Sequence, residues 1–387
     1  MTAALSTARP VQPSVVIVGA GTLCVLAFLC LEYGWRMPTL LGLGALLGLV
    51  LYHAAFGFTA AYRRLIVDRD PTAVRAQVVM LGVATLLFAP MLAGGQGIGI
   101  EVSGAKAPLG IQVAVGAFLF GLGMQLGNGC GSGTLFTLGG GSTRMIITLI
   151  FFCVGSFWGR LDMLWWNNTP RLDAIVLGEQ LGWGYGAGLQ LILLAGAWWI
   201  LGRSHTPDTP SRPFRLTVLL KGNWPFLWGA VALAVLSWTS LLIAGHTWSI
   251  TWAFSLWGAK AAQFFGWSAD GIWFWTGGYQ AHALKHSILE DTVSVMDLGI
   301  VFGALIASGL AGRFAPTTRL PWRTLAAAVI GGLLMGYGAR IAFGCNIGAF
   351  FSGVASTSLH GWLWIATALA GTWIGIHLRP WFGLPKS

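Results

Sequence analysis

The chain has 387 residues, of which 56% are hydrophobic and only 9% are charged, with a formal net charge of +10. A soluble domain carries about 25% charged residues, so this composition excludes a soluble globular protein and indicates an all-α integral membrane protein. The basic residues lie in loops between apolar segments, so we expect the partner of the chain to be a lipid bilayer and no nucleic acid.

Apolar segments long enough to cross a bilayer, which takes about 20 helical residues, recur along the chain. We predict about ten transmembrane helices, at 14–33, 38–60, 74–93, 110–127, 143–159, 182–202, 224–246, 293–312, 324–343 and 361–378. Shorter apolar pieces near 250–265 and 272–282 are predicted as half-helices or interfacial segments. The first apolar run has no clear cleavage site before Trp35, so we predict a retained span and no cleaved signal.

Basic residues gather in three loops, which the positive-inside rule assigns to the cytoplasm. They are Arg63, Arg64, Arg69 and Arg75, then Arg203, Arg212, Arg215 and Lys221, then Arg313, Arg319 and Arg323. The loops 94–109, 160–181 and 266–292 are then external.

One sixteen-residue motif occurs twice, at 121–136 and at 336–351. The copies are 215 residues apart, and six of the sixteen positions are identical, including Cys130 and Cys345. The loop before the first copy is predicted external and the loop before the second cytoplasmic, so we expect two inverted pseudo-symmetric repeats. Within one membrane domain, 1–387, repeat one is predicted at 14–202, a polar, proline-rich cytoplasmic linker at 203–223, and repeat two at 224–380.

Each copy breaks an apolar helix with glycines and a cysteine. Backbone groups freed at membrane depth cannot face lipid, so we expect re-entrant half-helices that meet near the bilayer midplane, where repeat-built transporters bind substrates. The N–H groups of such a turn favour an anion, and a thiol suits sulfur or selenium better than a hard oxyanion. The predicted pathway therefore contains both cysteines and the glycines beside them: Cys130, Cys345, Gly129, Gly131, Gly133, Gly344 and Gly348.

The other three cysteines, Cys24, Cys30 and Cys153, are predicted to be small core residues, which is the common role of a buried cysteine. No pair has C-x-x-C spacing and none lies in a predicted external loop. Neither a disulfide framework nor a zinc finger is expected.

Polar residues near the motif extend the predicted pathway. Arg340 lies five residues before Cys345, and Gln125 holds the matching place before Cys130. A membrane arginine either keeps a cavity positive for an anion or reaches an interface or a carbonyl, and both readings stay open. Asn128 and Asn346 flank the cysteines. One reading is that they bond the substrate or the broken backbone, and the other is that they serve as turn residues.

Two further residues, His53 and Lys260, either line the pathway or sit at headgroups. His282 and His286 have a spacing that suits a metal on one helical face, but two ligands without a third favour a solvated face, and no metal site is predicted. We assign no Asp or Glu to the interior of a span, so no acidic proton relay is predicted.

The Gly-x-Gly-x(5)-Gly-Cys-x(2)-Gly signature in both halves resembles the YeeE/YedE family of bacterial inner-membrane proteins, which take up sulfur compounds such as thiosulfate. The resemblance implies a multi-pass inner-membrane protein whose loops dip to a central constriction, where Cys130 and Cys345 pass thiosulfate through S–H···S contacts. It also implies a small cytoplasmic sulfur-carrier protein as a partner. Thiosulfate transporters of this family carry a third cysteine in an early helix, and Gly57 occupies the matching place here.

The predicted function is import of thiosulfate or a related small sulfur anion, with another sulfur or selenium compound as an alternative that Gly57 leaves open. A membrane thiol or persulfide redox protein is a second alternative. The nearest candidate bases, Arg144 and His360, lie more than a helical turn from either cysteine, and no haem, flavin or iron–sulfur pattern is present. We therefore expect a transporter, no enzyme and no cofactor. A structural subunit, the third reading, leaves the cysteine motif unexplained.

Overall fold

The computed structural model describes residues 10–203, 216–317 and 320–386. Ten helices in these ranges are long and apolar enough to cross a membrane. They coincide with the ten predicted spans to within a few residues, with three exceptions. Arg36–Asp68 continues past the predicted 38–60, and Ile111–Gly139 and Trp322–Ala355 continue through the cysteine motifs. The prediction of a multi-pass, all-α membrane protein is confirmed. Much of the predicted linker, including Arg212 and Arg215, lies outside the described residues, as do Arg9 and Arg319.

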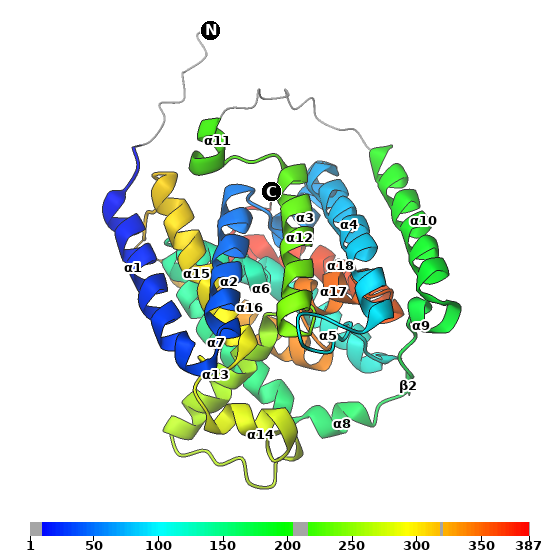
Figure 1. The fold of residues 1–387 in the computed structure, drawn as a ribbon. Helices are drawn as coiled ribbons and strands as arrows, with labels where there is room; N and C mark the ends of the chain where they lie inside the picture. The colour runs from blue at the N-terminus through cyan, green and yellow to red at the C-terminus, as the bar shows by residue number, and fades with distance from the viewer. Residues whose placement is uncertain (1–9, 204–215, 318–319, 387) are drawn as a thin grey trace.

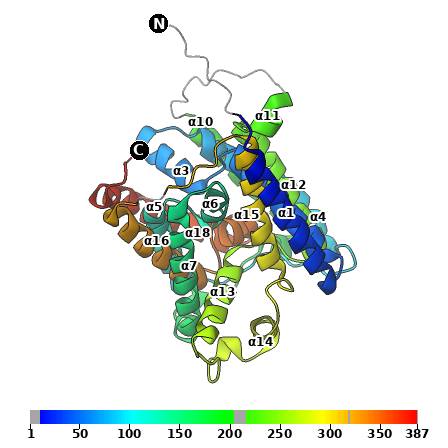
Figure 2. The same cartoon turned by 90° about the vertical axis from the view of Figure 1, so that its left-hand side faces the viewer.

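The helices follow one another with short connections (Figures 1 and 2). In the first half they are α1 (Pro13–Cys30), α2 (Arg36–His53), α3 (Phe58–Arg63), α4 (Thr72–Gly94), α5 (Ile111–Gly127), α6 (Gly131–Gly139), α7 (Thr143–Leu161), α8 (Met163–Asn167), α9 (Leu177–Leu181) and α10 (Trp183–Gly202). In the second half they are α11 (Leu216–Lys221), α12 (Phe226–Ala244), α13 (Thr251–Phe264), α14 (Gly278–Lys285), α15 (Thr292–Leu310), α16 (Trp322–Ile341), α17 (Ser352–Ala355) and α18 (Leu359–Leu378).

Short segments of other geometry complete the chain. They are the 3₁₀ turns η1 (Leu31–Tyr33), η3 (Trp273–Trp275) and η5 (Arg379–Phe382), and the π-helical segments η2 (Arg64–Asp68) and η4 (Asn346–Phe351). Two-residue strands β1 (Leu109–Gly110) and β2 (Arg171–Leu172) pair antiparallel, with Leu109 opposite Leu172.

The outer helices present apolar side chains outward. On α1 only Gly19 and Cys30 are buried, while Ile17 is 69% and Phe28 73% exposed. Helix α10, on another outer side of the bundle in Figure 1, likewise exposes Ile192 and Trp199. Such faces are stable against lipid and would be unfavourable in water, which is why hydropathy located the spans correctly.

Inside the bundle, glycines bring helix backbones into direct contact. A β-carbon added to Gly121 of α5 would lie 2.0 Å from the carbonyl oxygen of Ala368 in α18. Similar approaches occur between α2 and α15 at Gly44, and between α7 and α16 at Gly155. Small residues allow this packing in membranes, where helix association depends on van der Waals contact and not on the hydrophobic effect.

The two ends of the bundle differ in charge. Helices α3, α10 and α15, which are followed by the predicted basic loops, end on the side that carries α11, here called the α11 end (Figures 1 and 2). The opposite side carries α8 and α14 and is called the α14 end. The three basic loops therefore begin at one end of the molecule, as the positive-inside reading requires.

Both cysteine motifs interrupt a helix. Helix α5 ends at Gly127 and α6 begins at Gly131, whereas α16 ends at Ile341 and η4 begins at Asn346. The division of the chain into two inverted repeats around these breaks stays a prediction.

Gly121→Ala is expected to lower the free energy of unfolding by about 1–3 kcal/mol, because a methyl group at this crossing forces α5 and α18 apart. The control is Gly188→Ala in α10, where an added β-carbon has no neighbour within 4 Å. Thermal unfolding of both variants in detergent measures the difference. Equal midpoints for the two would show that the α5–α18 contact is not tight.

Candidate functional site

The first motif forms a turn that aims backbone N–H groups at a thiol. Asn128 ends α5 in the left-handed region, with φ of 66°, and Cys130 then caps the N-terminus of α6. The Cys130 sulfur accepts a hydrogen bond from the backbone N–H of Gly133 at 3.4 Å and lies 3.5 Å from the Ser132 hydroxyl. The thiol is fully buried.

The second motif repeats this arrangement with a wider turn. Gly344 has φ of 151°, a conformation that favours glycine, and Cys345 caps η4. The Cys345 sulfur accepts from the N–H of Ile347 at 3.4 Å. The turn is held from α18 because the Trp364 indole donates to the carbonyl of Gly344 at 3.3 Å.

The fold brings the two motifs together. A β-carbon added to Gly131 would lie 3.0 Å from the Cys345 sulfur and 3.5 Å from Ile250, the residue before α13. The thiol of the second motif therefore packs against the residue that follows the cysteine of the first. Two fully buried thiols from positions 215 residues apart share one region of the core.

The segment before α3 is the third wall of this region. The backbone N–H of Phe58 faces the Cys130 thiol. Gly57, directly before it, has φ of −108° and ψ of 124°, which any residue adopts, and an added β-carbon would meet only the ring of Phe136, at 3.9 Å. The structure therefore leaves room for a side chain at position 57, where the resembled transporters carry their third cysteine.

Several buried polar atoms beside the thiols lack a protein partner. Among the described residues, the Thr59 hydroxyl and the Gln125 side-chain oxygen have no hydrogen-bond partner, and the Asn346 amide and the Tyr62 hydroxyl have none beyond each other. Tyr62 lies beside Asn346 and within electrostatic reach of Cys130. The Gln125 amide nitrogen donates to the carbonyl of Thr59 at 3.1 Å, which ties α5 to α3. Unpartnered buried polar groups are expensive, so this cluster suits water or a polar ligand.

Arg340 lies in the interior and does not reach out to the membrane surface. It is 3% exposed, donates to the Thr251 hydroxyl at the start of α13, and lies within electrostatic reach of Cys345. Arg160 of α7 lies close enough for the two guanidinium groups to repel one another. This finding favours the reading in which Arg340 keeps a cavity positive.

A second group of arginines, which sequence reasoning did not connect, surrounds the end of α5. Arg379 donates to the carbonyl of Gln125 at 2.5 Å and to the Asn128 side chain at 3.3 Å, and Arg144 donates to the carbonyl of Leu126. Arg63 and Arg144 both lie within electrostatic reach of Arg379. The acid–base contacts among the described residues are Lys106 with Glu179 and His282 with Glu290, so this group has no carboxylate partner.

Two predicted pathway residues, Asn128 and Lys260, serve local backbone structure. Asn128 is exposed and serves the left-handed turn, which is the turn-residue reading. The Lys260 amine donates to the carbonyls of Leu284 and His286 at 3.0 and 2.5 Å, so it fixes the segment after α14. Partial burial lowers the pKa of that amine, while the carboxylate of Asp291 acts to raise it.

His53 is buried at the α11 end beside Trp224, with 5.7 Å between the ring centroids, and neither ring nitrogen has a partner among the described residues. Its predicted place on the pathway stays untested.

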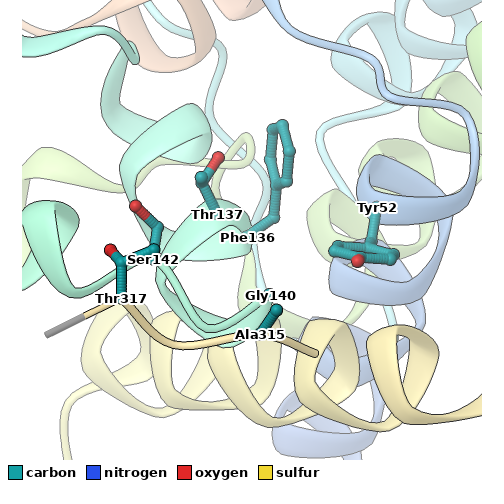
Figure 3. Close-up of a pocket in the computed structure, with 7 residues that line it drawn as sticks. All are labelled: Tyr52, Phe136, Thr137, Gly140, Ser142, Ala315 and Thr317. Carbon is teal, nitrogen blue, oxygen red and sulfur yellow. The ribbon is translucent and has the colours of Figure 1, made fainter. Parts of the chain in front are cut away.

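Two cavities, each of about 260 Å³, border the cysteine motifs. One is lined by Tyr52, Phe136, Thr137, Gly140, Ser142, Ala315 and Thr317 at the α11 end (Figure 3). The other is lined by Ser103, Gly104, Ala105, Lys106, His246, Thr247, Ser249, Phe343, Gly348 and His360. Phe136, which borders the first cavity, belongs to the Cys130 motif, and Gly348, which borders the second, belongs to the Cys345 motif. Each cysteine motif therefore borders one cavity.

The cysteines and histidines show no metal or disulfide at the thiol region. All five cysteines are free. The ligand atoms of His282, His286 and Glu290 lie within 4.8 Å of one another near the α14 end, so the fold supplies a third group that spacing did not reveal. The sequence-based preference for a solvated face at this cluster stays a prediction.

One expectation is wrong: a span does contain an acidic residue. Asp297 lies in α15 and is fully buried. The predicted span 293–312 included it, and its single charge within an apolar run was the signal that should have identified it.

Comparison with known proteins decides the family. A family model described as "Sulphur transport" matches residues 53–374, which contain both cysteine motifs. The chain belongs to the YeeE/YedE family of sulphur transport proteins. The match covers most of the chain, so the resemblance inferred from the motifs is confirmed.

Named relatives fall into two groups. The chain is 27% identical to the thiosulfate transporter TsuA of Spirochaeta thermophila over 85% of this chain and 95% of that protein, and 26% identical to TsuA of Escherichia coli over 87% and 94%. It is 33% identical to the probable transporter YedE of Escherichia coli, over 42% of this chain but only 40% of that relative. The full-length similarity is therefore to the TsuA proteins.

Asn346→Leu is expected to raise the free energy of unfolding by about 1–3 kcal/mol, because it replaces a buried amide, whose one polar neighbour among the described residues is the Tyr62 hydroxyl, with an apolar group of similar size. The comparison variant is Asn128→Leu, which places a branched residue in a left-handed turn and should lower stability by about 1–2 kcal/mol. Thermal unfolding without substrate measures both. A destabilised Asn346→Leu would mean that the amide is hydrogen-bonded in the protein.

Proposed function

We propose that this chain is a multi-pass transporter of the bacterial inner membrane that imports thiosulfate, or a related small sulfur anion, past Cys130 and Cys345. The observation that carries the proposal is that the two cysteine motifs meet in the core, with a cavity bordering each motif. The full-length similarity to proteins named thiosulfate transporters supports the same substrate.

Thiols suit the sulfur end of thiosulfate. A thiol is a weak, polarizable donor, and its S–H group can point at a soft sulfur atom as the anion passes. The N–H groups of Gly133, Ile347 and Phe58 face the same region and stabilise negative charge. Passage is therefore non-covalent, with one thiol handing the anion to the other.

A redox or persulfide reaction has less support. Such chemistry needs a thiolate and a neighbouring base or cation to form it. The side chain nearest to Cys130 is the Ser132 hydroxyl, and Arg340 is the charged group that lies within reach of Cys345. His360, a candidate base from sequence, bonds the Ser358 hydroxyl at 2.8 Å instead.

Arginines make both approaches favourable for an anion. Arg340 and Arg160 lie on the side of the thiols toward the α14 end, whereas Arg63, Arg144 and Arg379 surround the end of α5 toward the α11 end. An anion is poorly solvated in a low-dielectric interior, and cations without carboxylate partners offset that cost. The basic loops place the α11 end in the cytoplasm, so import runs from the α14 end to the α11 end.

The membrane potential opposes this movement. Each elementary charge moved across 100 mV costs about 2.3 kcal/mol, so a dianion that enters an inside-negative cell costs about 4.6 kcal/mol. Import then needs either a coupling ion or rapid removal of the product. A small cytoplasmic sulfur-carrier protein that takes the anion at the α11 end is the partner we propose for removal.

Cys130→Ala and Cys345→Ala are each expected to lower thiosulfate uptake at least about tenfold, because each removes one of two thiols that the anion must pass. Growth on thiosulfate as the only sulfur source, in a strain that lacks other uptake routes, measures the effect. The control is Cys30→Ala, a buried cysteine in α1. Full growth of both thiol variants would remove the thiols from the mechanism, and a substrate-dependent mass increase on Cys130 would favour the persulfide alternative.

Gly57→Cys is expected to fold normally and to raise thiosulfate uptake several-fold, roughly the effect of one added hydrogen bond, because position 57 has room for a third thiol beside Cys130. Gly57→Ser is the matched control, since its hydroxyl has a similar size but a harder oxygen. A rise for cysteine alone supports a thiol relay for thiosulfate. A different result would exclude thiosulfate as the substrate: neither variant changes thiosulfate uptake, and the wild-type protein transports a selenium compound or another sulfur compound faster than thiosulfate.

A further inference from the structure

The least explained group in the core is the carboxyl of Asp297. It lies five residues into α15, so it is about 7.5 Å along the axis from the start of the helix at the α14 end. The side chain is fully buried, and neither carboxyl oxygen has a hydrogen-bond partner among the described residues.

An ionised carboxylate without a partner is too poorly solvated at such a position to persist. The acid is therefore neutral in this conformation and carries a proton. A leucine or asparagine would be more favourable if the position were only structural, and an acid inside a membrane span indicates ion or proton movement.

The surroundings of Asp297 connect it to the α14 end. The titratable groups within its electrostatic reach are Asp291, at the start of α15, and Cys153 of α7. On the α2 side, the backbone contacts of the residues next to Asp297 are made by uncharged Gly44. Lys260 of α13 lies within reach of Asp291.

Asp291 is itself well satisfied, unlike Asp297. Its carboxylate accepts from the Trp252 indole at 2.8 Å, from the Tyr279 hydroxyl at 2.5 Å and from the N–H of Ser294 at 2.8 Å. Burial and, after it, the Asp291 carboxylate raise the pKa of Tyr279, which stays a donor. The Asp291 carboxyl group is thus held by three donors at the start of α15, on the α14 side of Asp297.

Helix α13 contacts both this acid pair and the thiol region. At its start, the Thr251 hydroxyl accepts from Arg340, and Ile250 borders Gly131 next to the Cys345 sulfur. Farther along, Trp252 donates to Asp291, and Trp257 donates to the Ser294 hydroxyl at 3.0 Å, one turn before Asp297. A shift of α13 when an anion displaces the Arg340 contact would therefore change the environment of the acid.

We propose that Asp297 carries the proton that is imported with the anion, so that the protein is a proton-coupled transporter. This inference rests on the proposed function. The carboxylate takes one proton from the α14 end before the anion passes and releases it toward the α11 end afterwards, and no covalent bond other than O–H changes. One proton cancels one of the two charges of thiosulfate and thereby lowers the electrical cost of import.

The test uses the purified full-length protein in vesicles that contain a pH-sensitive dye. The proteins compared are wild type, Asp297→Asn and the exposed control Asp173→Asn. Labelled thiosulfate is added outside the vesicles, at neutral or at acidic external pH. Asparagine has the same shape but carries no titratable proton. For wild type and the control we expect uptake to rise about tenfold with external acid, a size typical of coupled sites, and the vesicle interior to acidify as thiosulfate enters. For Asp297→Asn we expect exchange of internal for external thiosulfate to continue. Its uptake should not rise at acidic external pH, and no protons should enter the vesicles.

Two results would overturn the proposal while leaving thiosulfate transport intact: wild type that moves thiosulfate without protons, or Asp297→Asn that keeps the response to acid. If wild type does not exchange thiosulfate at all, the proposed function itself fails, which the exchange assay reports separately. Should Asp297→Asn not fold, infrared difference spectroscopy of wild type replaces it. A protonated-carboxyl band that changes when thiosulfate is added supports the proposal, and the absence of such a change contradicts it.

Discussion

Backbone groups at membrane depth must find partners within the protein, and the structure around the thiols depends on this constraint. Where α5 and α16 break, the freed N–H groups bond the sulfur of the cysteine that begins the next helical segment. The freed carbonyls at the end of α5 are bonded by Arg379 and Arg144 instead. The same groups that satisfy the broken helices thus concentrate thiols, N–H donors and guanidinium groups in one region.

Glycine packing keeps these breaks in place. Gly121 of α5 contacts α18, and Gly155 of α7 contacts α16, so each broken helix is held by a neighbour. Contacts this close leave little freedom for those helices to move. Helix α13 makes fewer contacts of this kind and is instead joined to its neighbours by the side chains of Thr251, Trp252 and Trp257. Movement during transport is therefore expected there.

The charge distribution follows from what the interior has to conduct. An anion pathway needs cations without carboxylates, and the arginines near the thiols meet this condition. The buried acid Asp297 lies on α15, and neither it nor those arginines forms an ion pair among the described residues. Buried ion pairs between them would neutralise the guanidinium charges that the proposed anion pathway needs and the carboxyl group that would carry a proton.

The sequence by itself determined the class of protein, the ten spans, the family and the two cysteines, because hydropathy depends on local composition and the motif is a contiguous pattern repeated 215 residues apart. It also singled out Arg340 and Gln125, since both lie within a motif copy, and their place on a pathway stays a prediction. Only the tertiary structure decided that Asn128 and Lys260 serve local backbone contacts, that Tyr62 and Thr59 join the thiol region, and that Arg63, Arg144 and Arg379 form one group. Those residues come from helices far apart in the chain, and their proximity depends on packing between helices, which no local pattern encodes.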